Sequence, residues 1–95
     1  MYLTDEARHY LSSDAAFDSL LPIHIQKLSG IHWTPLNVAY TAARFLAPDA
    51  QSKTIDIGAG VGKFCIAGSA VAGGTFTGIE QRKNFVTIGN KAIKK

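Results

Sequence analysis

Three glycines and two acidic residues form the pattern of this sequence with the clearest chemical content. Gly58, Gly60 and Gly62 alternate with other residues directly after a short β-branched run, and Asp56 lies two residues before the first of them. Glycines at such a turn let the chain bend tightly and let a ligand approach the backbone. Glu80 ends a second β-branched run farther along the chain. Its two carboxylate oxygens can accept hydrogen bonds from the two hydroxyls of a ribose.

Two common phosphate-binding motifs do not match this loop. A P-loop requires G-x-x-x-x-G-K-[ST], but Ile57 occupies the first glycine position and Phe64 the hydroxyl position. A dinucleotide fingerprint requires G-x-G-x-x-G, and its third glycine position is taken by Lys63. The loop instead reads G-x-G-x-G with an acid two residues ahead of it.

That arrangement resembles motif I of class I, Rossmann-like, S-adenosylmethionine-dependent methyltransferases, which is written acid-x-G-x-G-x-G. The resemblance covers residues 33–95 and implies the N-terminal half of such an enzyme. It implies that Glu80, like the acid that the family places at the end of its second strand, holds the cofactor ribose. The stretch 33–46 resembles the helix that precedes motif I, whose N-terminal side closes over the methionine end of the cofactor. The cofactor-binding residues expected from the resemblance are Asp56, Gly58, Ala59, Gly60, Gly62, Glu80, Gln81 and Thr34.

The residue types agree with S-adenosylmethionine as the cofactor. It is a sulfonium cation without a phosphate, so two acids suit it better than a lysine-bearing phosphate site. Methyl transfer is expected to be a direct displacement, in which positioning of the acceptor supplies much of the catalysis. No catalytic residue is assigned, and the acceptor, whether protein, RNA or small molecule, is not identified.

Two strands and two helices are expected to position these residues. The order from Lys53 onward is a strand over Lys53–Ile57, a helix over 62–71, a strand over 75–80 and a helix over 81–95. Such alternation predicts an α/β fold with a parallel sheet. The carboxyl ends of parallel strands lie beside one another, so Glu80 is expected to face the same crevice as the glycines.

The first 50 residues predict a helical N-terminal segment in front of this β-α-β-α unit of residues 51–95. A helix is expected from the N-cap Thr4 to about Leu11, and the polar cluster 12–14 is expected to cap a second short helix. A third begins at Pro22 and is expected to stop at Gly30. The fourth is expected to have Thr34 as N-cap, Pro35 as its first residue and Pro48 as its end.

Charge and the remaining reactive side chains point to ordinary structural roles. Residues 1–50 carry three basic and five acidic side chains, and residues 51–95 carry seven basic and two acidic ones. We expect a solvated helix face for most of this basic half, and a solvated Lys63. Cys65 is expected in the core, and Trp33 in the core or in a lid. The three histidines and Cys65 lack metal-ligand spacing, so no metal is expected.

The composition also limits where the protein is expected to act. Asp5 and Glu6 stand where a signal peptide would be basic, and no run approaches the ~20 apolar residues of a membrane span. The single cysteine excludes an internal disulfide, which favours a cytoplasmic location and no membrane. The chain of 95 residues is expected to be a single domain at most.

Two strands are fewer than the family's usual seven. The sheet is therefore expected to be truncated, and the chain alone to be incomplete for catalysis. It is expected to be part of a longer enzyme, to associate with itself or a partner that completes the sheet, or to have its second half on another polypeptide. The alternatives to a methyltransferase are an NAD(P)-dependent oxidoreductase fragment and a non-catalytic module whose basic half binds nucleic acid or a protein.

Overall fold

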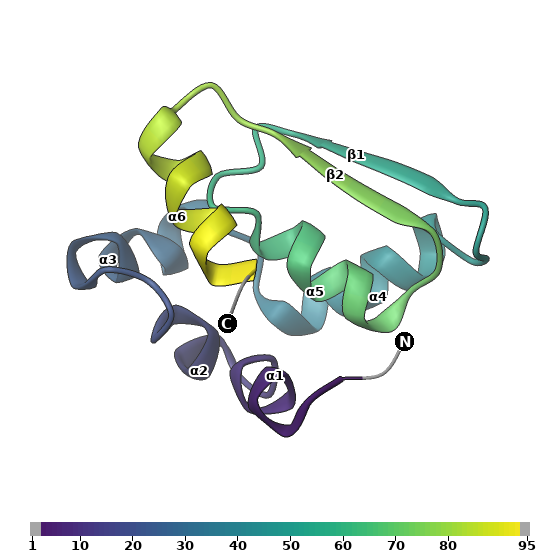
Figure 1. Cartoon of the computed structure of the whole chain (residues 1–95), viewed down its shortest axis with the longest axis horizontal. Helices are drawn as coiled ribbons and strands as arrows, with labels where there is room; N and C mark the ends of the chain where they lie inside the picture. Colours follow the sequence, from purple (N-terminus) through teal and green to yellow (C-terminus); the bar gives the residue numbers. More distant parts are fainter. Residues whose placement is uncertain (1–2, 94–95) are drawn as a thin grey trace.

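The computed structural model describes residues 3–93, in which six helices accompany one two-stranded sheet (Figure 1). The elements are α1 (Asp5–Tyr10), α2 (Asp14–Asp18), α3 (Ile23–His32), α4 (Leu36–Leu46), β1 (Lys53–Ile57), α5 (Lys63–Val71), β2 (Thr75–Ile79) and α6 (Lys83–Ile93). β1 and β2 are parallel, with Lys53 opposite Thr75 and Ile57 opposite Ile79. The expected mixture of helices with a parallel strand pair is confirmed.

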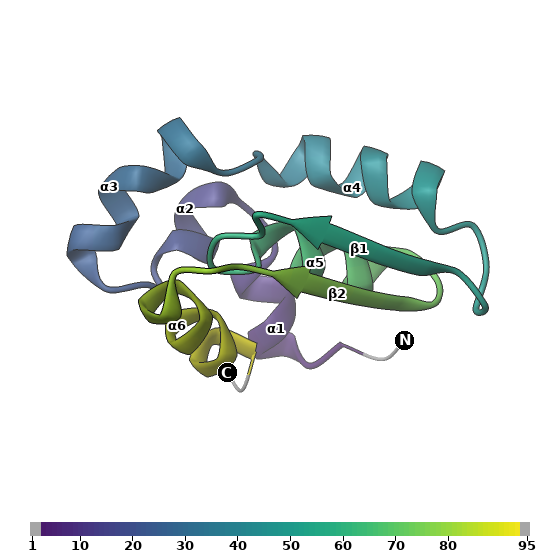
Figure 2. The same cartoon turned by 90° about the horizontal axis from the view of Figure 1, so that it is seen from above.

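The helices α4 and α5 lie on one side of the sheet, with α1 and α2 beyond them, and α6 lies near the carboxyl ends of the strands (Figures 1 and 2). Gly68 lets α5 lie close to both neighbours, because a Cβ there would come within 3.2 Å of the Ala43 Cβ and 2.7 Å of the Phe76 ring. On the other face of the sheet, Ile55, Ile57 and Ile79 are each more than half exposed. Within residues 3–93, that face has no helix covering it.

The hydrophobic core lies where the N-terminal helices meet the loop between β1 and α5. Its buried members are Phe17, Leu21, Ile25, Leu36, Ala39, Val61, Ala67 and Phe85. Phe17 and Val61 are the largest side chains that are fully buried. Val61 lies between two glycines of the loop, so its burial anchors the loop to the core. Residues 3–50 and 51–93 thus share one core.

The first helix boundaries agree with the capping residues. The Thr4 hydroxyl accepts a hydrogen bond from Ala7 N at 3.0 Å, and the Ser13 hydroxyl accepts one from Ala16 N at 3.0 Å. The expected end of the third helix at Gly30 is wrong, because α3 continues to His32 and Trp33 is its C-cap. A glycine costs helix stability without necessarily ending the helix.

The expected N-cap role of Thr34 is also wrong. α4 begins at Leu36, and Pro35 holds the N-cap position with φ −57° and ψ 148°. The side-chain acceptor comes instead from a distant residue, because the Asp14 carboxylate accepts a hydrogen bond from Leu36 N at 2.8 Å. A carboxylate at this place also interacts favourably with the helix dipole.

The boundaries in the second half agree closely with the sequence pattern. β1 has the expected bounds, β2 ends one residue before Glu80, and Gly62 is the N-cap of α5. α6 begins at Lys83, two residues after its expected start, and is described to Ile93. The expected helix end at Lys94 and Lys95 lies outside the described residues. Throughout 3–93, no helix has the length and apolar character needed to cross a membrane.

Candidate functional site

The glycine loop (residues 58–62) follows β1 and curls over the carboxyl end of β2. Gly58, Gly60 and Gly62 have φ values of +77°, +61° and +85°, a region that residues with a side chain rarely adopt. The backbone N–H groups of Gly58 and Ala59 both donate to the carbonyl oxygen of Ile79, at 2.8 and 3.0 Å. The loop therefore needs glycine at these positions and is fixed directly to the neighbouring strand.

Gly60 contacts both Glu80 and Trp33, and the second contact needs the absence of a side chain. Its N–H donates to Glu80 Oε1 at 2.9 Å, and a Cβ on it would lie 2.3 Å from Trp33 Nε1. The Trp33 indole therefore rests directly on the loop. It also meets Phe85 edge-on, with ring centroids 5.7 Å apart. Trp33 thus joins the loop to α6.

Glu80 lies directly after β2 with only 4% of its side chain exposed. Its Oε2 accepts hydrogen bonds from Arg82 N at 2.9 Å and from Arg82 Nε at 3.0 Å. The Arg82 side chain, followed by the N–H groups of Arg82 and Gly60, lowers the pKa of the Glu80 carboxyl to about 2. Because the pKa is lowered, these contacts stabilise the fold when the pH is above 4.5, the ordinary pKa of the group. This stabilisation is lost as the pH falls towards 2.

Two hollows share Gly58 in their lining. The Glu80 hollow is lined by Ile57, Gly58, Ile79, Glu80, Gln81 and Arg82. The Asp56 hollow is lined by Trp33, Thr34, Asp56, Gly58, Ala59, Lys63 and Phe64. A Cβ on Gly58 would meet no atom within 4 Å. A ligand that extends from one hollow to the other can therefore pass directly over the Gly58 backbone.

The carboxylate of Asp56 is half-buried and lines the Asp56 hollow, where a ligand can reach it. Burial raises the pKa of the Asp56 carboxyl, because the charged form loses water. The described part of the chain supplies no hydrogen bond to this carboxylate. It is therefore an acceptor that a cationic or hydrogen-bond-donating ligand would satisfy.

Lys63 differs from its predicted solvated state, because its side chain is only 3% exposed. Its ammonium lies 2.8 Å from Asp14 Oδ1 and 5.6 Å from the centroid of the Phe17 ring. The hydrogen bond from Lys63 is the main cause that lowers the pKa of Asp14. The same carboxylate oxygen accepts from Leu36 N. Asp14 thus ties the first turn of α5 to the start of α4.

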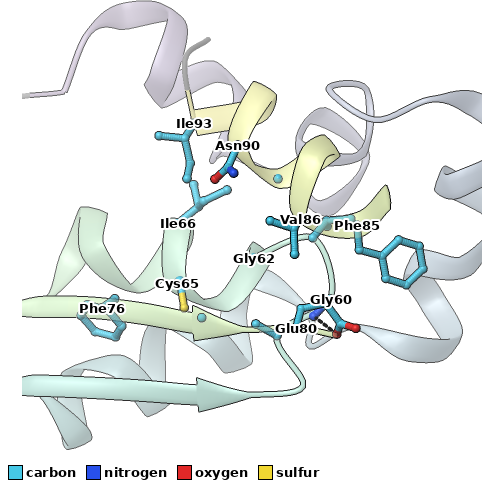
Figure 3. A pocket seen from close by; sticks show the side chains of 14 residues that line it. Gly60, Gly62, Cys65, Ile66, Phe76, Glu80, Phe85, Val86, Asn90 and Ile93 are labelled. Atoms are coloured by element: carbon cyan, nitrogen blue, oxygen red, sulfur yellow. Dashed lines mark hydrogen bonds between the residues drawn. The ribbon is translucent and has the colours of Figure 1, made fainter. Parts of the chain in front are cut away.

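A third hollow lies on the other side of the glycine loop, between α5, β2 and α6 (Figure 3). Its lining includes Cys65, Phe76, Val86, Asn90 and Ile93, and Glu80 and Gly60 stand at its edge with their hydrogen bond. Burial, and then the charge of Asp56, raises the pKa of the Cys65 thiol. The thiol is thus protonated at neutral pH and unsuited to act as a nucleophile.

The structure gathers the residues expected at the site around the carboxyl ends of β1 and β2. Each of them lines at least one of the three hollows: Asp56, Gly58, Ala59, Gly60, Gly62, Glu80, Gln81 and Thr34. Two contacts have no signal in the sequence pattern: that of Trp33 with Gly60 and the Lys63–Asp14 pair. The Arg82–Glu80 pair could have been found, because Arg82 follows the acid by only two residues. Searches against protein-family models, curated proteins and solved structures find no match to this chain.

Proposed function

We propose that this chain is the S-adenosylmethionine-binding part of a class I methyltransferase, with the start of a Rossmann-like sheet. The observation that carries the proposal is the hydrogen bond from Gly60 N to Glu80 Oε1 at 2.9 Å. This bond joins the glycine loop to Glu80, the acid at the end of the second strand. A ribose-containing ligand at a parallel sheet needs such a loop and such an acid side by side. The open Gly58 backbone lies between them and the Asp56 hollow.

The two hollows suit the two ends of this cofactor. In the proposed arrangement the ribose hydroxyls donate hydrogen bonds to Glu80. The part of the ligand between the ribose and the amino acid group crosses Gly58. The amino acid end then reaches the hollow that holds Asp56 and Thr34, where its ammonium group finds a carboxylate without another donor. Bound there, S-adenosylmethionine would supply an electrophilic methyl group. The protein's own contribution is to orient the ligand between two carboxylates.

Two contacts disfavour a ligand that carries phosphates. A pyrophosphate approaches the backbone at the second glycine of a dinucleotide loop, but the Trp33 indole covers Gly60 here. Lys63, the one cation in the Asp56 hollow, has its ammonium paired with Asp14 and buried. A neutral or cationic nucleoside derivative is therefore favoured over NAD(P). The completion of the sheet by a second copy or a partner stays a prediction of the sequence.

Fluorescence of Trp33, the single tryptophan of the chain, tests the proposed function. Trp33 lines the Asp56 hollow, so a ligand that enters it changes the surroundings of the indole. Titration with S-adenosylhomocysteine is expected to give a saturable change in emission, and NAD⁺, which does not absorb where tryptophan emits, none at the same concentrations. A saturable response to NAD⁺ alone would favour the oxidoreductase alternative and contradict the proposal.

Asp56→Asn is expected to stabilise the free protein at pH 7 and to weaken ligand binding. Because burial raises the Asp56 pKa, the ionised form carries a cost that is present above that pKa and absent below it. The amide removes this cost at neutral pH. It also removes a charge-assisted contact to the ligand, for which we expect an affinity loss of roughly 10-fold or more.

Thermal melts at pH 7 and pH 4, with titrations of S-adenosylhomocysteine at pH 7, check both effects. The melting temperature of Asp56→Asn should exceed that of the unmodified chain at pH 7, and the difference should shrink at pH 4. Asp49→Asn serves as a control of equal charge, since Asp49 lies outside the three hollows. A variant that binds as tightly as the unmodified chain would exclude Asp56 from the ligand contacts.

A further inference from the structure

The guanidinium of Arg82 contacts both oxygens of the Glu80 carboxylate, which the proposed function assigns to the ribose. Its Nε lies 3.0 Å from Glu80 Oε2, and its Nη2 lies 3.5 Å from Glu80 Oε1. The guanidinium carbon stands 4.3 Å from the centroid of the Phe85 ring. Phe85 thus supports one face of the guanidinium, while 56% of the Arg82 side chain remains exposed.

The Arg82 side chain covers the acceptor positions of Glu80 that the backbone donors leave open. A carboxylate offers about four lone-pair positions, two on each oxygen. Gly60 N takes one on Oε1 and Arg82 N takes one on Oε2, both at 2.9 Å. These backbone donors hold the carboxylate in place. The two positions that remain, one on each oxygen, are those that the Arg82 side chain faces.

We propose that the Arg82 side chain occupies the two acceptor positions of Glu80 that a vicinal diol needs, so that Arg82 sets the affinity of the site for a ribose. The inference rests on the proposed function, since it assigns the ribose to Glu80. The diol binds when the guanidinium swings away from Glu80 towards solvent. Because more than half of the Arg82 side chain is exposed, water can solvate the released guanidinium, so this exchange lowers the affinity modestly and does not block binding.

Arg82→Met tests this inference, because methionine keeps the apolar stem beside Phe85 and lacks the guanidinium. We expect it to tighten the binding of S-adenosylhomocysteine and of adenosine about 2- to 5-fold, which corresponds to about 0.4–1 kcal/mol. The binding of 2′,3′-dideoxyadenosine, which lacks the diol, should not change. Lys83→Met is the matched control: it removes one charge from the next residue, which is exposed, and should leave all three affinities as they are.

The outcomes separate this inference from the proposed function. If the unmodified chain binds S-adenosylhomocysteine and Arg82→Met binds it more weakly or equally, the inference is wrong while the proposed function stands. An equal gain for dideoxyadenosine or for Lys83→Met would reduce the effect to net charge and overturn the inference. If all variants melt cooperatively and none binds S-adenosylhomocysteine or adenosine at millimolar concentration, the proposed function and the inference both fail.

Discussion

Asp14→Ala is expected to lower the free energy of unfolding by about 2–4 kcal/mol. The substitution removes the acceptor for Leu36 N at the start of α4, at a cost of about 1 kcal/mol. It also leaves the buried Lys63 ammonium without its partner at 2.8 Å, at a further cost of about 1–3 kcal/mol. For a domain of this size, the melting temperature should fall by roughly 10–25 °C. Thermal and urea unfolding monitored by circular dichroism measure both quantities.

Two further variants separate the pair from general effects of charge. Asp5→Ala removes an equal charge from an exposed position in the first turn of α1, and should cost no more than about 1 kcal/mol. Adding Lys63→Met to Asp14→Ala should recover about 1–3 kcal/mol, because no buried ammonium is left unpaired. An Asp14→Ala chain that melts like the unmodified protein would show that Asp14 does not hold the start of α5 to the start of α4.

Gly58→Ala is expected to weaken the binding of S-adenosylhomocysteine roughly 10- to 100-fold while the protein stays folded. The new methyl group meets no protein atom within 4 Å, so it would stand in the open space where the proposed ligand crosses from the Glu80 hollow to the Asp56 hollow. The positive φ of +77° adds a strain of about 1–2 kcal/mol to the folded state. Calorimetric titration and a melting curve on the same sample give the two effects separately.

Gly60→Ala provides the contrast within the same loop. Its Cβ would lie 2.3 Å from Trp33 Nε1, so the indole must move as well as the backbone. We expect a larger loss of stability from this variant than from Gly58→Ala, with a shift in Trp33 emission before any ligand is added. If Gly58→Ala binds as tightly as the unmodified chain, the ligand does not cross Gly58.

The features of this fold that depend on residues close together in the sequence can be predicted from it. β-branched residues bounded by glycines define β1 and β2, and alternating glycines define a loop in which positive φ is required. Thr4 and Ser13 cap the helices that directly follow them. The position of Glu80 beside the loop follows from the rule that parallel strands end at one edge.

The remaining contacts join residues whose proximity the fold alone creates. Asp14 and Leu36 lie 22 positions apart, so Thr34 was the only capping residue that local pattern could supply. Lys63 was expected in water because lysine is rarely buried without a partner, and its partner Asp14 belongs to another helix. The indole of Trp33 likewise reaches Gly60 only once α3 has continued to His32.

Isothermal titration calorimetry with S-adenosylhomocysteine, on the unmodified chain and on Glu80→Ala, tests the central claim most directly. The unmodified chain is expected to bind one equivalent with submillimolar affinity at pH 7. Glu80→Ala should bind at least about 10-fold more weakly, because the ribose loses its charged acceptor. Circular dichroism melts of both proteins confirm that each is folded during the titration. The absence of heat with the folded, unmodified chain at millimolar ligand, or equal affinities of the two proteins, would contradict the account.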